Sequence, residues 1–187
     1  MSDRFTFLDT PLPGLKLVEP KPIGDHRGYL ERLYCVDEFA SLFAGKPIAQ
    51  VNRSLTRKRG SVRGMHFQRS PHADAKLVSC MVGSVFDVAV DLRRASPTFL
   101  HWHGEWLSGD NHRSLLIPEG FAHGFQALSA GCQLLYLHSA SYRPDHEGGL
   151  HPQDPKLAIA WPEQVAELSA RDAGHPYLED GFDGVAT

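Results

Sequence analysis

The chain of 187 residues carries 19 basic and 22 acidic side chains, a formal net charge of −3, and 42% of its residues are hydrophobic. These values are typical of a soluble globular protein and exclude a disordered chain, and the charge balance leaves no electrostatic footprint for nucleic acid or an anionic membrane. No apolar run approaches the roughly 18 residues of a transmembrane helix, and no signal peptide is visible at the start. One domain spanning residues 1–187 is expected.

The chain consists mainly of strand-like segments separated by turns, with few helical signals. A short helix is predicted over 37–43, ended by Gly45 and Pro47, and another turn or two over 162–170. Strands are predicted at 48–55, 61–68, 76–82, 85–92, 99–107, 114–117, 123–128 and 134–142. Because Gly83 and Ser84 separate two β-rich runs, 76–82 and 85–92 are expected to form a hairpin. Short strands without helix–strand alternation predict an all-β, double-sheet jelly roll with a few short peripheral helices.

His66 is the first candidate for chemistry. In an extended strand it shares a face with Gln68, and the neighbouring Gly64 leaves room for a ligand over the imidazole. It is either a base lining a barrel mouth or a histidine satisfied by hydrogen bonds in a β core. Strict alternation places Arg63 on the opposite face. Both serve one site only if Gly64 marks a bulge or bend, or if Arg63 reaches a neighbouring subunit's ligand.

Three other positions have both a structural and a chemical interpretation. Tyr136 points inward with His138, either anchored to a backbone group or as a general acid. Asp172 follows Ser169 as in a helix N-cap, and an aspartate that reaches a histidine would orient its ring. Lys76 begins a strand, as a surface lysine or as a stabiliser of an oxyanion.

The sequence also contains a possible set of metal ligands and three cysteines. His101, His103 and Glu105 lie at i, i+2 and i+4, reasonable ligand chemistry for a jelly-roll barrel. Their spacing resembles the HxHxxxxE signature of metal-binding cupins only loosely, since Glu105 is too close, and a His/Trp-rich interface strand is the alternative. The cysteines, at positions 35, 80 and 132, form no Cys-x-x-Cys pair, which indicates free thiols in a cytoplasmic protein.

Taken together, the motifs resemble those of the dTDP-4-dehydrorhamnose 3,5-epimerase family over about residues 14–177. The matching segments are 25–31, 50–54, 60–68, 75–78, 83–91, 96–99, 117–125 and 168–173, with Tyr136 and Tyr142. The resemblance implies a cupin-type jelly roll, active as a homodimer, that epimerises C3 and/or C5 of a dTDP-linked 4-keto-6-deoxyhexose through an enolate. It implies no cofactor and no metal.

The resemblance also implies residue roles. His66 would be the base, Asp172 its orienting partner, Tyr136 the acid on the opposite face, and Lys76 the group that stabilises the enolate oxygen. The positions that match nucleotide- and sugar-binding residues of the family are Arg27, Glu31, Gln50, Asn52, Arg63, His123, Glu147 and Arg171. Tyr29 and Tyr142 match aromatic positions where a nucleobase could stack, and some of these contacts are expected from the partner chain.

One departure from the family pattern keeps alternatives open. The family often has a tryptophan shortly after the glutamate matching Glu147, whereas this chain continues with Gly148, Gly149, Leu150, His151 and Pro152. A C3-only or C5-only epimerase of an antibiotic-type sugar is therefore the nearest alternative. From other classes, a metal-dependent cupin such as a dioxygenase and a non-catalytic sugar-nucleotide-binding cupin remain. The acid–base pair His66 and Tyr136 speaks against the last.

Overall fold

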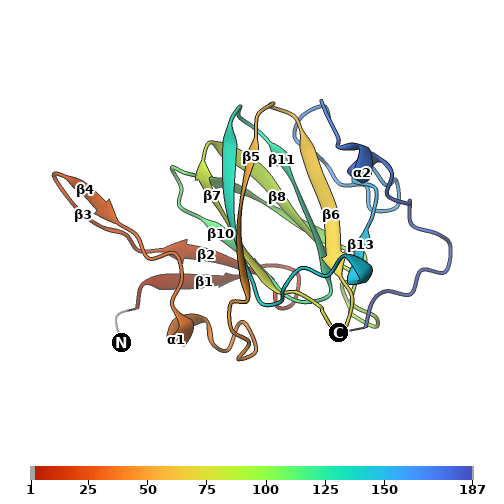
Figure 1. Ribbon diagram of the computed structural model, residues 1–187, viewed down its shortest axis with the longest axis horizontal. Coiled ribbons are helices and arrows are strands. Elements are labelled where there is room, and N and C mark those ends of the chain that lie inside the picture. Colours follow the sequence, from red (N-terminus) through yellow and green to blue (C-terminus); the bar gives the residue numbers. More distant parts are fainter. Residues whose placement is uncertain (1–2, 187) are drawn as a thin grey trace.

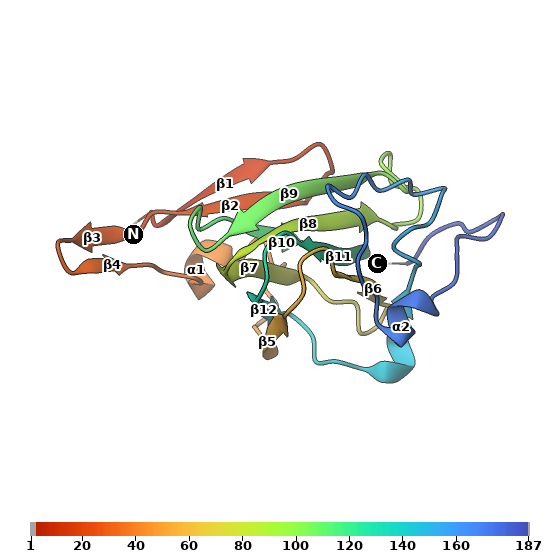
Figure 2. The same ribbon diagram turned by 90° about the horizontal axis from the view of Figure 1, so that it is seen from above.

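The computed structural model describes residues 3–186, and most of its strands belong to two antiparallel sheets that pack face to face (Figures 1 and 2). The first sheet has the strand order β1 (Phe5–Asp9), β2 (Lys16–Pro20), β10 (Ser114–Ile117), β7 (Lys76–Val82), β12 (Cys132–His138) and β5 (Gln50–Thr56). The second sheet has the order β13 (Glu147–Gly149), β6 (Val62–Gln68), β11 (Phe121–Ala127), β8 (Ser84–Asp91) and β9 (Trp102–Ser108). The prediction of an all-β, cupin-type double-sheet jelly roll is confirmed.

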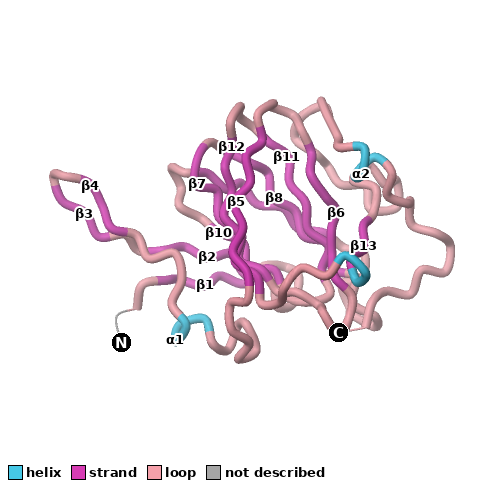
Figure 3. The backbone as a smooth tube through the Cα atoms, viewed as in Figure 1, coloured by secondary structure: helices cyan, strands magenta, loops and turns pink. Residues whose placement is uncertain are grey.

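The remaining elements are short and peripheral. A hairpin of β3 (Ile23–Asp25) and β4 (Gly28–Leu30) projects away from both sheets, as Figure 1 shows at the left. Helix α1 (Val36–Phe39), the 3-10 turn η1 (Pro144–His146) and α2 (Ala170–Ala173) lie outside the sheets (Figure 3). Among the described residues, no helix has the length and hydropathy that spanning a bilayer requires.

Alternating side chains place a separate apolar layer on each face of the second sheet. In β8, Val85 and Ala89 face the first sheet and pack in the core between the sheets, whereas Phe86, Val88 and Val90 face outward. The outward residues are covered by the C-terminal part of the chain, including Leu150, Leu157, Leu178 and Val185. Because both faces of β8 and β11 are covered, these strands are buried almost throughout. The two strands thus form a rigid support for any side chain that they carry.

The predicted hairpin at Gly83 is wrong, although both of its strands exist. β7 pairs with β10 and β12 in the first sheet, whereas β8 pairs with β9 and β11 in the second. Gly83 has φ +79, and a Cβ there would lie 2.4 Å from Ser129 Oγ. A tight turn therefore leads from one sheet to the other, and local sequence signals of a turn do not distinguish this from a hairpin.

The two helix predictions have different outcomes. A helix begins at Val36 and continues as turns to residue 45, close to the predicted 37–43, with Phe39 and Phe43 buried against the first sheet. No helix forms over 162–169, because residues 166 and 167 are held beside β6. The Ala166 N–H donates to Gly60 O, and Glu167 O accepts from the Val62 N–H. Helix α2 begins only at Ala170.

A bulge in β6 resolves the conflict between Arg63 and His66. Against β11, His123 pairs with His66 but Phe125 pairs with Arg63, so two residue steps of β11 face three of β6. Gly64 has φ +129, in the region that favours glycine. The extra residue lets Arg63 and His66 line the same pocket.

Replacing Gly64 with alanine should destabilise the protein and disturb this pocket. The new Cβ would lie 2.5 Å from Gly124 Cα and 2.8 Å from His123 O, and both contacts are backbone that cannot swing aside. We expect a loss of about 2 kcal/mol or more, which lowers Tm by roughly 4–8 °C in a domain of this size. Calorimetry measures it, with Gly131→Ala as control, since a Cβ at Gly131 meets nothing within 4 Å although φ is also positive there. Equal losses in the two variants would mean that close approach at Gly64 is unimportant.

Candidate active site

A pocket of about 580 Å³ opens between β5, β7 and β12 of the first sheet and β6 and β11 of the second. Its walls include these residues predicted from sequence: Gln50, Asn52, Arg63, His66, Lys76, His123, Tyr136, Tyr142, Glu147 and Arg171. Polar side chains replace the apolar core at this end of the sandwich, and Tyr136 lies at the boundary between the two. The predicted site residues thus come from opposite sheets and from distant parts of the sequence.

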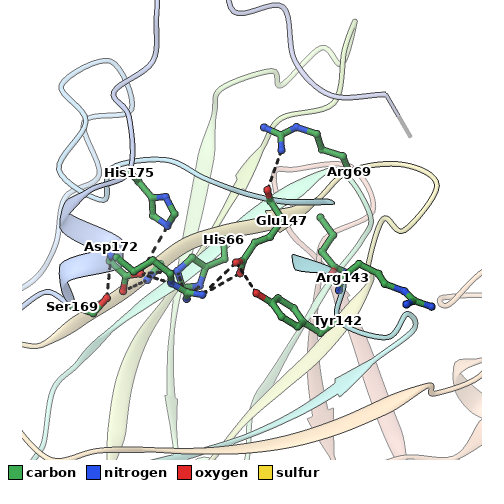
Figure 4. Close-up of polar contacts among 11 residues, drawn as sticks. His66, Arg69, Tyr142, Arg143, Glu147, Ser169, Asp172 and His175 are labelled. Carbon is green, nitrogen blue, oxygen red and sulfur yellow. Dashed lines mark hydrogen bonds and ion pairs between the residues drawn. The ribbon is translucent and has the colours of Figure 1, made fainter. Parts of the chain in front are cut away.

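His66 and Asp172 form a close pair on the wall made by the second sheet (Figure 4). His66 Nε2 lies 2.8 Å from Asp172 Oδ1, and only 3% of the Asp172 side chain is exposed. Burial opposes ionisation of Asp172, but hydrogen bonds from His66 and from the Gly64 N–H outweigh it, so the pKa of this carboxyl lies below its ordinary value. An ionised Asp172 orients the imidazole through its contact with Nε2.

Asp172 makes the contacts that both sequence interpretations require, the helix cap and the contact with a histidine. Ser169 caps α2, its Oγ accepting from the Asp172 N–H at 3.0 Å. The capped first turn fixes the backbone of Asp172, and its side chain is then directed at His66 (Figure 4). The cap therefore positions the carboxylate.

A charged group lies between His66 and the rim of the pocket. Arg171 Nη2 is 2.9 Å from His66 Nε2, while Arg171 Nη1 is 3.3 Å from Glu147. Tyr142 donates its hydroxyl proton to Glu147 Oε2 at 3.0 Å (Figure 4), and this bond raises the pKa of the phenol. Arg171, Glu147 and Tyr142 thus form a continuous polar rim beside the imidazole.

His175 completes a group of three possible metal ligands with His66 and Asp172. Its Nε2 lies 3.9 Å from Asp172 Oδ1, and the three ligand atoms are within 4.8 Å of one another. Burial, followed by the nearby His66, lowers the pKa of His175, which favours a neutral ring. The guanidinium of Arg171 against His66 disfavours a divalent cation here.

The metal set considered from the sequence is not assembled. His101 is exposed and precedes β9, whereas His103 Nε2 contacts Glu105 Oε1 at 2.7 Å. Within residues 3–186, the grouping of three His, Cys, Asp or Glu ligand atoms is the one at His66. The failure has a simple origin, because the expected i, i+2, i+4 alternation requires a strand that already includes residue 101.

The facing wall carries Tyr136 on β12. Its hydroxyl lies 3.1 Å from Ser54 Oγ on the neighbouring strand β5. Burial raises the pKa of Tyr136 well above its ordinary value, so the phenol keeps its proton throughout the neutral range. A protonated phenol on the first sheet therefore faces an imidazole on the second, which is the arrangement that an acid and a base on opposite sides of a substrate require.

Two further histidine–carboxylate pairs line or support the pocket. His123 Nε2 is 3.0 Å from both carboxylate oxygens of Asp87, and both side chains are buried. His138 Nδ1 is 2.8 Å from Asp74 Oδ2, which is also 3.6 Å from Lys76 Nζ. Asp74, Asp87 and Ser54 were not among the residues predicted for the site. The only sequence signal for His138 was the face that His138 shares with Tyr136.

The structure does not bring three predicted residues to this pocket. Arg27 pairs with Asp25 on the projecting hairpin, and Tyr29, 61% exposed, packs edge-on against His112. Glu31 Oε2 accepts from His112 Nδ1 at 3.2 Å. The β3–β4 hairpin projects away from the two sheets (Figure 2), and the residues that line the pocket come from other segments.

The fold is a cupin-type jelly roll, and its pocket brings together the groups of an acid–base enzyme. Residues 9–180 match the family described as dTDP-4-dehydrorhamnose 3,5-epimerase. The chain belongs to this epimerase family, a family of isomerases.

Relatives with different regiochemistry are similar to the chain to almost the same degree. It is 45% identical over 177 residues to the dTDP-4-dehydrorhamnose 3,5-epimerase of Salmonella typhimurium, covering 94% of this chain and 96% of that relative. It is 44% identical over 174 residues to the dTDP-4-dehydrorhamnose 3-epimerase of Streptomyces niveus, covering 92% and 83%. The crystal structure of a Legionella pneumophila dTDP-6-deoxy-D-glucose-3,5-epimerase in complex with dTDP-4-keto-L-rhamnose superposes with a TM-score of 0.89, at 40% identity and 98% coverage of both chains.

Proposed function

We propose that this protein epimerises C3 and C5 of a dTDP-linked 4-keto-6-deoxyhexose through an enolate. The observation that carries the proposal is the placement of His66 with Asp172 on one sheet and Tyr136 on the facing sheet, across one pocket. A proton on a carbon next to a ketone is acidic because its loss gives an enolate. Inversion at that carbon then needs a base on one face and an acid on the other.

In the proposed reaction, the His66 imidazole removes the proton from the carbon beside the C4 ketone. The C–H electron pair becomes the enolate double bond, and negative charge collects on the C4 oxygen, where the Lys76 ammonium stabilises it. Tyr136 then donates its proton to the opposite face of the carbon, and the imidazolium and phenolate return to their starting states by proton exchange with water. Every step is a proton transfer, so the reaction as written uses no cofactor and no metal.

The remaining pocket residues suit a nucleoside diphosphate. Arg63 and Arg171 each present a planar guanidinium, which binds phosphate oxygens bidentately. Gln50, Asn52 and His123 offer hydrogen bonds to the hydroxyls of the hexose and the deoxyribose, and Tyr142 at the rim offers a face for the thymine ring. Glu147 lies between Tyr142 and Arg171 and sets both in place.

We further propose that each chain is one domain and that two chains form a cytoplasmic homodimer in which the β3–β4 hairpin reaches the partner's pocket. The exposed hairpin supports this, since Arg27, Tyr29 and Glu31 match substrate-binding positions yet lie away from their own pocket. The free thiols Cys35, Cys80 and Cys132 are consistent with a reducing compartment.

Mixing two inactive variants should restore activity if the hairpin acts in trans. The Arg27→Ala chain keeps its own His66, and in a mixed dimer it receives the intact hairpin of a His66→Asn chain. With free subunit exchange, equal mixing should give about a quarter of the wild-type rate, since half of the dimers then carry one intact site. Unmixed variants and sedimentation analysis are the controls. If sedimentation shows that subunits have exchanged but activity does not recover, the hairpin does not act in the partner's pocket. It then acts within its own chain or has no role in the reaction.

Proton NMR with dTDP-4-keto-6-deoxyglucose in D₂O tests the reaction itself. We expect deuterium to enter both C3 and C5. Incorporation at a single carbon would show a mono-epimerase, which the Streptomyces niveus relative and the Gly148–Gly149 stretch after Glu147 favour as the second candidate. Tight binding of the sugar nucleotide without exchange would support a non-catalytic cupin instead.

A further inference from the structure

Asp74 is a buried carboxylate in the pocket to which the proposed reaction gives no role. It lies two residues before Lys76, the first residue of β7, and only 5% of its side chain is exposed. Its Oδ2 is 2.8 Å from His138 Nδ1 and 3.6 Å from Lys76 Nζ, whereas its Oδ1 has no hydrogen-bond partner among the described residues. Because His138 pairs in register with Lys76 across β12 and β7, the three side chains form one compact unit.

The contacts of Asp74 are part of a longer chain of hydrogen bonds along the wall made by the first sheet. The Tyr142 N–H donates to Gln50 Oε1 at 2.9 Å, and Gln50 Nε2 donates to Asn52 Oδ1 at 3.1 Å. Asn52 Nδ2 is 3.4 Å from His138 Nε2. If Asn52 donates to Nε2, the histidine proton is on Nδ1 and is donated to Asp74. Each hydrogen bond of the chain, from Tyr142 at the rim of the pocket to Asp74, then has one donor and one acceptor.

The distance between Asp74 and Lys76 indicates electrostatic attraction without a direct hydrogen bond. A separation of 3.6 Å is longer than a hydrogen bond, so Asp74 attracts the ammonium without taking up its N–H groups. The protons of Lys76 stay available for a substrate oxygen. The His138 hydrogen bond fixes the Asp74 carboxylate, and through it the direction in which a long, otherwise flexible side chain extends.

We propose that Asp74, held by His138, is a positioning residue that directs the Lys76 ammonium at the oxygen on which the enolate charge develops. This proposal rests on the proposed epimerase function and adds to it a residue pair outside the base and acid. Electrostatic stabilisation of such an oxygen is effective only where the donor is placed before the charge appears. Asp74 therefore acts through Lys76 and touches no reacting atom.

A double-mutant cycle between Asp74→Asn and Lys76→Met tests this coupling. Asparagine keeps the shape and an acceptor for His138 but removes the charge that steers Lys76. We expect Asp74→Asn to lower kcat about tenfold with KM changed by no more than about threefold, because the lost interaction is made in the transition state. In the Lys76→Met background the same substitution should cost less than about twofold, since the group through which Asp74 acts is gone. His138→Gln should give a smaller loss of the same kind and serves if Asp74→Asn fails to fold.

The control is a histidine–carboxylate contact outside the pocket, that of His103 with Glu105 on β9 of the second sheet. His103→Gln should leave kcat within about twofold of the wild type. Equal losses for Asp74→Asn in both backgrounds would show a structural role and overturn the proposal, as would a wild-type rate in Asp74→Asn. A wild-type protein that exchanges no substrate proton would instead overturn the proposed function, so the two failures are distinguishable.

Discussion

Replacing His66 with asparagine should abolish deuterium exchange at the sugar carbons while the protein still binds dTDP. Asparagine has no basic nitrogen, so the proton beside the ketone has no acceptor, and general base catalysis contributes about 10²- to 10⁴-fold. We expect kcat to fall at least about a thousandfold, at the upper part of that range, because the variant loses the group that accepts the proton in the proposed reaction. NMR in D₂O measures the exchange, and calorimetric titration with dTDP should give a Kd within about threefold of the wild type.

A histidine outside the pocket gives the matched control. His72 packs against the His146 ring at 4.5 Å between centroids and does not line the pocket, so His72→Asn should exchange substrate protons at nearly the wild-type rate. Normal turnover by the His66→Asn variant would remove His66 as the base and leave its pair with Asp172 a structural contact.

The sequence was informative about fold class because both sheets are built from alternating strands. The residues of β8 divide between two cores as their pattern predicts. What local pattern could not supply was the partner of each strand. The turn at Gly83 has the sequence of a hairpin turn but connects strands of different sheets. The segment predicted to be helical over 162–170 is instead held by backbone hydrogen bonds to Gly60 and Val62, about a hundred residues earlier in the chain.

The same distinction applies to the site. His66, Tyr136, Lys76 and Asp172 could be named because the resemblance supplied residues that are far apart in sequence, and the structure places them around or behind one pocket. Asp74 and Ser54 could not be found in that way. Each acts on a neighbour across a strand pair, and such a contact depends on register, which no single segment encodes.

Replacing Tyr136 with phenylalanine should separate exchange from inversion. The ring and its packing remain, but the proton donor on the wall opposite His66 is lost. His66 can still remove a proton and return a deuteron to the same face, so the substrate should gain deuterium with its configuration retained. We expect the rate of epimerisation to fall about 10²- to 10³-fold, while exchange falls much less. Because burial raises the pKa of Tyr136, the wild-type phenol stays protonated across the neutral range, and the loss should be similar throughout it.

Ser54→Ala is the control that distinguishes the phenol itself from its hydrogen bond. It removes the Oγ that lies 3.1 Å from the Tyr136 hydroxyl but keeps the acid, so inversion should slow only severalfold, as expected for one neutral hydrogen bond of about 1 kcal/mol. Analysis of the product by NMR gives the ratio of deuterated, uninverted sugar to epimer for each variant. If Tyr136→Phe loses exchange and inversion in equal measure, Tyr136 acts before the enolate forms. If inversion is unchanged, another group donates the proton, and the facing sheets position the sugar without supplying its acid.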